Sequence, residues 1–312
     1  MNHEIQNIKD LFKQLLPPHE LTYCEVDVHS ILGLHFQTAG VAVKLETGLE
    51  CYGSSSSFLR APPLMFAAYE CLERYAIHNQ LSPPLEGKTF RNSLSNGVAI
   101  HQNFFEAKKA AYLELLERNE ILKSWYFNTP IRHINLSAEY YFSAEMIDQY
   151  DLHFVDFSSI PDCFVVGIFA LPKIPSLNPI YGFGSGLNES EGIFKARKEF
   201  LTRLGFLWGE TPAYEDQLGD IRTPNFHQEF YLRHENLQHL RDWLQEDRKQ
   251  KKNFNKYQVR DLNYENITPN AWGSKYPVIK ATASDSIPLF FGLPTPELFD
   301  FNYRCDIPHP IV

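Results

Sequence analysis

The chain has 312 residues, of which 44% are hydrophobic and 21% are charged, and its formal net charge at pH 7 is −9. This composition excludes disorder throughout, and the acidic balance excludes an overall basic surface for nucleic acid, although a local basic patch stays open. No apolar run is long enough to cross a bilayer, and the first residues lack the apolar core of a signal peptide, so we expect no membrane contact and a cytoplasmic location.

The first part of the chain predicts a helix, a small group of strands and a second helix. Apolar residues recur at helical spacing over residues 4–16, and Pro17-Pro18 ends that pattern. Residues 21–50 alternate and are rich in Val, Ile and Thr, which is typical of two or three strands. The run GSSSS at 53–57 indicates a turn-rich loop, and a helix follows at 62–81.

The rest of the chain continues the alternation of loops, helices and strands. The elements expected in order are a loop at 82–97, a long helix at 104–127, strands at 153–159 and 163–171, a loop at 181–190, a helix at 191–208 and a strand at 276–283. Residues 210–270 are polar and irregular, with one helix predicted within 236–252 and a basic end at 248–256 that we interpret as a solvated surface. No convincing boundary divides the chain. We therefore expect one domain over 1–312, with an N-terminal helix and strands in 1–50, a peripheral excursion at 210–270 and a Pro-containing tail at 288–312.

The five cysteines are scattered and form no CxxC pair. An odd, dispersed set fits neither a disulfide framework nor a zinc ribbon, so we interpret Cys24, Cys51, Cys71, Cys163 and Cys305 as reduced and mostly structural.

A turn-rich loop followed by a glutamate-bearing helix occurs three times. The first copy carries Glu70, Glu73 and Arg74 in the sequence ECLER. The second carries Glu114, Glu117 and Arg118 in ELLER, preceded by Glu106. The third copy, EGIFKARKEFLTR, is weaker and carries Glu191 and Glu199.

Helix geometry places the glutamates of the second copy on one strip. At about 100° per residue, Glu114 lies about 80° around from Glu106, and Glu117 lies about 20° around from it. The surrounding Ala, Leu and Tyr residues predict a largely buried helix. Several ionised carboxylates in such a helix are energetically costly unless cations neutralise them. Mg²⁺ bound to a nucleotide fits this need, and backbone amides of the preceding loops favour phosphate. The plainer alternative stays open: Glu70–Arg74 and Glu114–Arg118 are also ordinary i,i+4 surface pairs.

Several common nucleotide and hydrolase motifs are absent. The chain has no GxxxxGK[ST], HExxH or GxSxG sequence, and the GFGSG run at 182–186 does not keep the GxGxxG spacing. The sequence therefore predicts no P-loop. From the residues alone, the prediction is limited to an acidic metal site.

The segment SNGVAIHQNFFEAKKAAYLELLERN (95–119) resembles the central signature of the YcaO family. ECLERY resembles the upstream counterpart of that signature, YGFGSGLNESEGIFKARKEFL resembles its third block, and PHPIV is similar to its proline-rich end. The resemblance covers about residues 50–210 and 276–312. It implies an α+β fold with mixed or antiparallel sheets packed against glutamate-bearing helices.

The resemblance also implies an activity. YcaO proteins use ATP and Mg²⁺ to activate peptide amides in ribosomally made, modified peptides such as bacteriocins, and we expect an azoline-forming cyclodehydratase acting at Cys, Ser or Thr to give a thiazoline or oxazoline, the precursors of thiazole and oxazole. Peptide thioamidation with a different partner is a second possibility, and a degenerate nucleotide-binding scaffold subunit is a third. Expected partners are a precursor peptide and a leader-binding protein in trans, since residues before 50 leave no room for a fused leader-binding domain. A homodimer is also considered.

Site residues follow position by position from the resemblance. The residues implied to hold metal are Glu73, Glu106, Glu114, Glu117 and Glu199. Those implied to contact ATP or its phosphates are Glu70, Gln102, Arg118, and Lys195 or Arg197. His309, near the end of the tail, is assigned a possible catalytic part, and a surface role is the alternative for it.

Departures from the family pattern are concentrated near the same site. GSSSS and Phe66 stand where many members have a Gly-rich stretch and a Ser, and His101 stands in place of Gly. Asn119 replaces the usual Asp, Thr202 replaces the frequent Gln, and the tail lacks three alternating prolines. These departures are what the scaffold alternative rests on.

Overall fold

The structure is a computed structural model that describes residues 2–17, 19, 21–58, 63–161, 163–211, 220–245, 259–295, 298 and 307–311. Its N-terminal half contains α1 (Asn2–Leu15), β1 (Leu21–Ile31), β2 (Leu34–Lys44), β3 (Glu50–Phe58), α2 (Leu64–Gln80), β4 (Phe90–Asn92), β5 (Val98–Ile100) and α3 (Phe104–Phe127). The middle contains β6 (Arg132–His133), α4 (Ala144–Gln149), β7 (Tyr150–Asp156), β8 (Phe164–Pro172), β9 (Ile180–Gly186) and α5 (Glu189–Leu207). The last part contains α6 (Pro224–Leu232), α7 (Leu237–Trp243), β10 (Asn263–Asn266), β11 (Val278–Thr282) and β12 (Phe290–Gly292). Short 3₁₀ turns lie at Ala138–Tyr140, His234–Asn236 and Asn270–Trp272.

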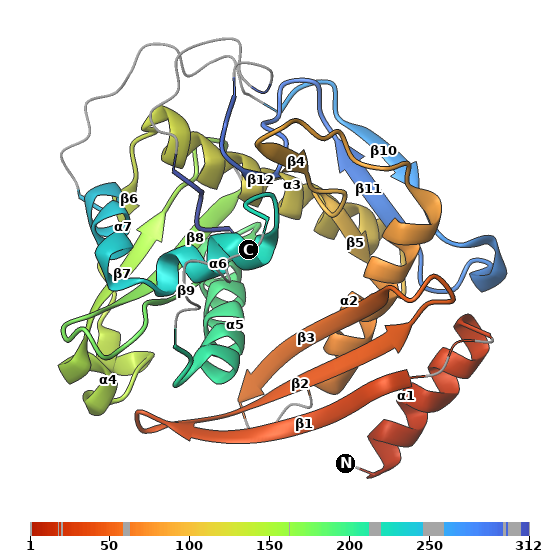
Figure 1. Ribbon diagram of the computed structural model, residues 1–312, viewed down its shortest axis with the longest axis horizontal. Helices are drawn as coiled ribbons and strands as arrows, with labels where there is room; N and C mark the ends of the chain where they lie inside the picture. The colour runs from red at the N-terminus through yellow and green to blue at the C-terminus, as the bar shows by residue number, and fades with distance from the viewer. Residues whose placement is uncertain are drawn as a thin grey trace.

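The described strands form four antiparallel sheets. Their strand orders are β1-β2-β3, β10-β11-β5, β12-β4 and β6-β7-β8-β9. Strands β3, β5 and β9 are therefore edge strands, and helices α2, α3 and α5 lie around the middle of the molecule between these sheets (Figure 1). This arrangement confirms the expected α+β fold.

Most of the predicted elements are confirmed within a few residues. The helix expected at 104–127 matches α3, and Asn103 caps its first turn by accepting hydrogen bonds from the amides of Phe105 and Glu106. Asn188 caps α5 in the same way through the amide of Glu191. The strand pattern of residues 21–50 corresponds to β1 and β2, with the third strand beginning at Glu50.

Two segments expected to be loops are edge strands instead. Residues 53–57 lie within β3, and residues 181–186 form most of β9. Their glycines serve close helix–strand packing rather than turns, because a Cβ on Gly53 would lie 2.1 Å from the Ala67 carbonyl oxygen and one on Gly182 would lie 2.5 Å from that of Ala196. β4 likewise falls within the loop expected at 82–97. Gly97, at φ +70°, does sit in the expected turn, as the Ser-Asn-Gly pattern indicates.

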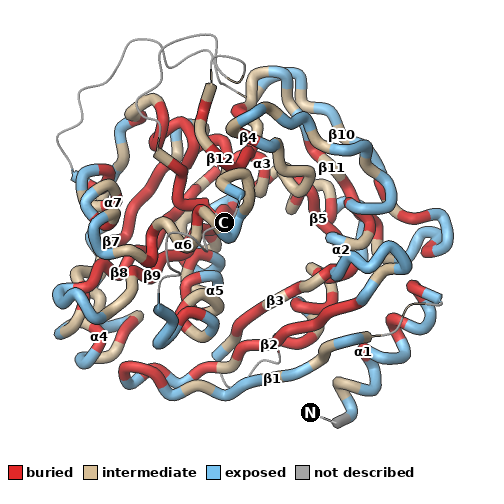
Figure 2. The backbone as a smooth tube through the Cα atoms, in the orientation of Figure 1, coloured by how far each residue is buried: buried red, intermediate tan, exposed pale blue. Residues whose placement is uncertain are grey.

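The region 210–270 is less peripheral than expected. Side chains of α6 and α7 are part of the largest core cluster, in which Tyr231, Leu240 and Trp243 are fully buried. The helix expected within 236–252 is the short α7, and residues 246–258, including the basic end, lie outside the described part of the chain. The aromatic ring of Trp243 stacks on Phe157, so this segment closes the core over the sheet of β7 to β9, in which β9 and nearly all of β8 are buried (Figure 2).

Two further expectations concern cysteines and membrane contact. Of the cysteines in the described residues, Cys24, Cys51, Cys71 and Cys163 carry free thiols, and Cys305 lies outside those residues. None of the helices in the described part of the chain combines the length and the hydropathy needed to cross a bilayer.

Candidate functional site

The glutamates of α2 reach the backbone of two edge strands. The carboxylate of Glu70 accepts a hydrogen bond from the amide of Ser54 on β3 at 2.7 Å, and Arg74 pairs with the same carboxylate at 2.6 Å. One turn later, Glu73 accepts from the amide of Ile100 on β5 at 3.1 Å. An i,i+3 spacing puts both carboxylates on one face of the helix, so α2 presents them toward the space between β3 and β5.

Helix α3 contributes the central part of the site. Glu114 accepts from the backbone amide of Val98 on β5 and pairs with Arg118 at 2.6 Å. Glu117 accepts from the hydroxyl and the amide of Ser185 on β9. The Arg118 guanidinium also donates to the carbonyl and hydroxyl oxygens of Ser95 at 3.2 Å, which fixes it against the Ser-Asn-Gly turn.

Helix α5 supplies the third carboxylate position and two cations. Glu199 accepts from the amide of Phe183 on β9 at 3.3 Å, and its electrostatic partners include Glu117 and Arg118. Lys195 lies one turn before Glu199 and acts electrostatically on Glu117. The Lys198 ammonium lies 3.8 Å from the ring centre of Phe66, close enough to Glu70 to be attracted by it. The glutamates of α2, α3 and α5 therefore hold three edge strands and face shared space.

The carboxylates of this site carry surplus negative charge. Desolvation by the surrounding protein and repulsion from Glu114 and Glu70 raise the pKa of Glu73 well above its ordinary value. Desolvation raises the pKa of Glu114 to about 7 and, together with repulsion from Glu117, that of Glu199 to about 8. Glu199 still has a solvent-accessible side chain, so the group is crowded by protein without being sealed from water. A cation that reached this region would relieve the repulsion.

The donor set suits Mg²⁺ held together with phosphate. All the donors are carboxylate oxygens, which hard divalent cations prefer. Among the described residues, no group of three or more His, Cys, Asp or Glu side chains is arranged so that it could hold a metal ion by itself. Mg²⁺ usually takes one or two protein carboxylates and completes its shell with water and nucleotide phosphates, so spaced glutamates on facing helices fit that mode.

Some of the sequence-derived site residues lie apart from this group. Glu106 is exposed in the first turn of α3, about 12 Å along the helix axis from Glu114. Gln102 is exposed and donates to the Tyr69 hydroxyl at 2.6 Å. Neither residue is brought against Glu114 or Glu117.

The expectation that Arg197 meets phosphate is not supported by its placement. Its guanidinium packs 4.2 Å from the ring centre of Phe58 and donates to the Tyr141 carbonyl oxygen at 2.6 Å. It points to a different side of α5 because neighbouring helix positions diverge by about 100°. Lys195 and Lys198 of α5 lie on the side of the glutamates. Arg203 also acts electrostatically on Glu199.

His309 is fully buried rather than free at the surface. Its Nε2 bonds to the Phe290 carbonyl oxygen, and its own carbonyl oxygen accepts from Nδ1 of His227 at 2.9 Å. The hydroxyl of Tyr231 donates to the neighbouring Pro308 carbonyl oxygen. The described end of the tail is thus anchored in the core, which excludes the surface alternative, and a catalytic part for His309 stays a prediction.

The contact between Lys198 and Phe66 is not predicted by the sequence. Phe66 is 55% exposed and stands four residues before Glu70 on α2. The signal available in the sequence was the i,i+3 spacing of Lys195 and Lys198, but nothing in it paired α5 with α2.

Comparison with protein families places the chain. The model of a family described as YcaO cyclodehydratase, ATP- and Mg²⁺-binding, matches residues 73–266, which is more than half of the chain. No match was found among curated protein sequences.

Three solved structures share the fold at low sequence identity. YcaO from Methanopyrus kandleri bound with AMPPCP and Mg²⁺ aligns with a TM-score of 0.58 and 14% identity, covering 90% of both chains. A heterocyclase in complex with substrate and cofactor aligns with a TM-score of 0.54 and 14% identity, covering 84% of this chain and 50% of that one. The E. coli microcin synthetase McbBCD complex aligns with a TM-score of 0.53 and 15% identity, covering 80% of this chain and 85% of the matched one.

Proposed function

This chain belongs to the YcaO family, and from that premise we propose that it is an ATP- and Mg²⁺-dependent enzyme that activates backbone amides of a ribosomally made peptide. The favoured reaction is azoline formation at Cys, Ser or Thr. A side-chain thiol or hydroxyl attacks the preceding carbonyl carbon, the resulting oxygen takes a phosphoryl group from ATP, and its departure as phosphate leaves the ring. The products are ADP, phosphate and a peptide lighter by one water.

The observation that carries this proposal is the convergence of desolvated glutamates from α2, α3 and α5. Glu73, Glu114, Glu117 and Glu199 are the residues that would hold Mg²⁺, and Glu70 would share the nucleotide side with Lys198. The metal would neutralise phosphate charge, which is the main requirement of phosphoryl transfer. Their mutual repulsion in the apo state supports a role in cation binding rather than in fold stability alone.

The cationic residues have separate tasks in this proposal. Arg118 is held by both Glu114 and the Ser95 turn, so its guanidinium is oriented before a nucleotide arrives. A pre-positioned guanidinium suits bidentate binding of phosphate. Lys195 and Lys198 add positive charge from α5, and Glu106 and Gln102 remain proposed outer members near the start of α3.

We further propose that a separate protein captures the leader of the precursor peptide. The McbBCD structure is a complex, which supports an additional protein partner for this chain. The heterocyclase structure contains a substrate, which supports substrate binding by the shared fold. The free thiols of the described residues suit a reducing, ATP-containing cytoplasm.

The decisive experiment combines the purified chain with ATP, Mg²⁺ and a Cys/Ser/Thr-containing precursor encoded beside its gene, together with the candidate leader-binding protein. ADP release and a peptide mass lower by one water support cyclodehydration. Exchange of oxygen for sulfur in the peptide, in the presence of a sulfur-donating partner, supports thioamidation instead. Mg-ATP binding with no peptide change in any combination supports the scaffold alternative and contradicts the enzyme.

A further inference from the structure

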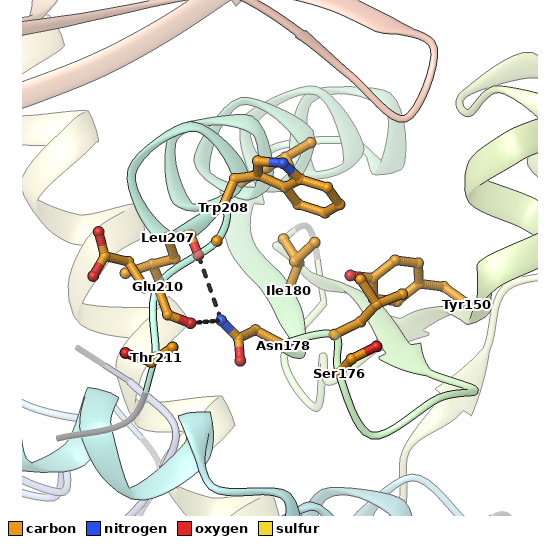
Figure 3. A pocket seen from close by; sticks show the side chains of 11 residues that line it. Tyr150, Ser176, Asn178, Ile180, Leu207, Trp208, Glu210 and Thr211 are labelled. Atoms are coloured by element: carbon orange, nitrogen blue, oxygen red, sulfur yellow. Dashed lines mark hydrogen bonds between the residues drawn. The ribbon is translucent and has the colours of Figure 1, made fainter. Parts of the chain in front are cut away.

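A cavity of about 270 Å³ lies at the end of α5, where the chain passes from β8 into β9 (Figure 3). Its lining comes from the first residue of β7, from residues 176–180 and from residues 204–211. None of these residues belongs to the glutamate group. The α5 residues that line it, Leu204 and Leu207, lie in the last turn of the helix, and Leu204 lies about 140° around the axis from Glu199. The cavity is therefore beyond the part of α5 that carries the glutamate of the proposed catalytic site.

The floor of the cavity is apolar and rigid. Ile180, Leu204 and Leu207 are buried, and the side chains of Ile180, Trp208 and Tyr150 turn toward one another (Figure 3). Trp208 is 40% exposed, so its indole joins the interior of the cavity to the surface. The rim is tied down by Asn178, whose side-chain amide donates to the carbonyl oxygens of Leu207 and Glu210.

One polar group inside the cavity lacks a partner. Tyr150 is 2% exposed, and its hydroxyl has no hydrogen-bond partner within the described part of the chain. The hydroxyl points into the cavity toward Ile180 (Figure 3). Buried polar atoms are nearly always paired in folded proteins, so this one calls for a ligand atom or an ordered water.

The size and chemistry of the cavity select one kind of ligand. An apolar cavity of roughly 150 Å³ takes up benzene, so this one has room for a substituted ring. No cationic side chain lines it, and Glu210 forms part of the rim, so the lining favours a neutral ligand over an anion. We propose that the cavity binds a neutral aromatic ring that carries one hydrogen-bonding substituent, a phenol or the side chain of a tyrosine, with the substituent paired to the Tyr150 hydroxyl.

The test uses p-cresol and toluene, which differ only by the hydroxyl. Each is titrated into the full-length chain while the indole NMR signal of Trp208 in labelled protein is followed. The wild type should bind p-cresol saturably and more tightly than toluene. Tyr150→Phe should weaken p-cresol binding by about 5- to 10-fold, as the loss of one hydrogen bond predicts, and should leave toluene binding equal or stronger. Tyr140→Phe, the same change at an 84% exposed position, is the matched control and should alter neither.

A third probe, N-acetyltyrosinamide, distinguishes the two sources of the ligand. Displacement of p-cresol by this compound supports a tyrosine side chain of a peptide, and binding of p-cresol alone supports a free phenolic molecule. Absence of saturable binding by all three probes overturns the proposal, as does an unchanged p-cresol affinity in Tyr150→Phe. Because Mg-ATP affinity is read separately in the same samples, failure here does not affect the proposed catalytic function.

Discussion

Glu70 and Glu199 make the same contact from different helices: each carboxylate accepts a hydrogen bond from the backbone amide 16 residues before it, that of Ser54 or of Phe183. The correspondence extends to the neighbouring residues, since Gly53 and Gly182 precede these amides and Arg74 and Arg203 follow the glutamates four residues later. In both places an antiparallel run of strands ends in an edge strand, and a helix then packs against it. The two places therefore share one local pattern of edge strand, glycine, bonded amide and helix glutamate.

The two patterns differ three residues after the bonded glutamate. Glu73 of α2 corresponds to Thr202 of α5, whose hydroxyl donates to the Lys198 carbonyl oxygen. Glu114 and Glu117 of α3 interact electrostatically with the glutamates of both patterns, with Glu70 and Glu73 of α2 and with Glu199 of α5. The proposed site thus depends on α3 more than on α2 or α5.

Replacing Glu117 by Gln should weaken Mg-ATP binding by at least about 10-fold, as losses of metal-site carboxylates generally do. The same is expected of Glu114→Gln. Neither variant should lower the melting temperature of the apo protein, because a neutral amide removes a desolvated charge whose pKa is already raised. Calorimetric titration with Mg-ATP and a thermal melt measure the two quantities. Glu145→Gln on α4 is the control, and unchanged affinity in both α3 variants contradicts the assignment.

Adjacent residues of α5 should behave oppositely when their charge is removed. Lys198→Met should reduce Mg-ATP affinity about 10-fold, because the ammonium between Phe66 and Glu70 is lost, with little change in melting temperature. Arg197→Met should leave the affinity unchanged and lower the melting temperature, because it removes the Phe58 contact and the bond to the Tyr141 carbonyl oxygen. An affinity loss confined to Arg197→Met would restore the original sequence-based assignment.

The two histidines that anchor the tail should make stability fall in acid. The amide of Gly292 donates to Nε2 of His227, so the proton of the neutral ring is on Nδ1, which donates to the His309 carbonyl oxygen. Burial lowers the pKa of His227 to about 4. A depressed histidine pKa contributes stability that is complete above about pH 6.5 and is lost as the pH falls toward 4, up to about 3 kcal/mol for this group.

The raised glutamate pKa values act in the opposite direction over part of the same range, so wild-type melts alone do not isolate the histidine. His227→Gln should be less stable than wild type at pH 7.5, and the gap between the two proteins should narrow by pH 4.5. Thermal melts of both proteins across this range test the expectation. A gap that stays constant with pH shows that His227 does not titrate with unfolding.

Deleting Pro308–Val312 should reduce turnover more than Mg-ATP affinity. The deletion removes the carbonyl oxygens that accept from Tyr231 and His227, so a lower melting temperature is also expected. Tyr231→Phe breaks the bond to Pro308 while leaving the tail in the chain, and so separates the two effects: it should lower stability slightly and leave turnover near wild type. Full turnover in the deletion variant would assign the tail no part in the reaction.

The sequence predicted the helices and most strands well because their signals are local. Asn103 before α3 and the alternation in β1 and β2 are readable in a single chain. Gly53 and Gly182 were wrongly predicted to lie in loops. A strand glycine that lets a helix pack closely cannot be told from a turn glycine in the sequence alone. What decides between the two is the packing of residues 14 positions away.

The candidate site was predicted in part for a similar reason. Glu114, Glu117 and Arg118 share one helix, so spacing alone places them together. Whether Glu106 joins them depends on how far along α3 the neighbouring strands reach, and whether Lys198 or Arg197 faces inward depends on the rotation of α5 against β3. Rotation and reach are set by tertiary packing, which a one-chain pattern does not contain.

The glutamates that bond to β3, β5 and β9 also limit how a peptide can pair with these strands. On the short β5, the amides of Val98 and Ile100 are already bonded to Glu114 and Glu73, and Ser54 and Phe183 are occupied in the same manner on their own strands. An incoming strand therefore cannot pair with these four amides, although the opposite edges of the three sheets, at β1, β10 and β6, stay open to β-augmentation. In the proposed function, a peptide at this site would be held by side chains or by a second protein, with its own backbone amides free of strand pairing there.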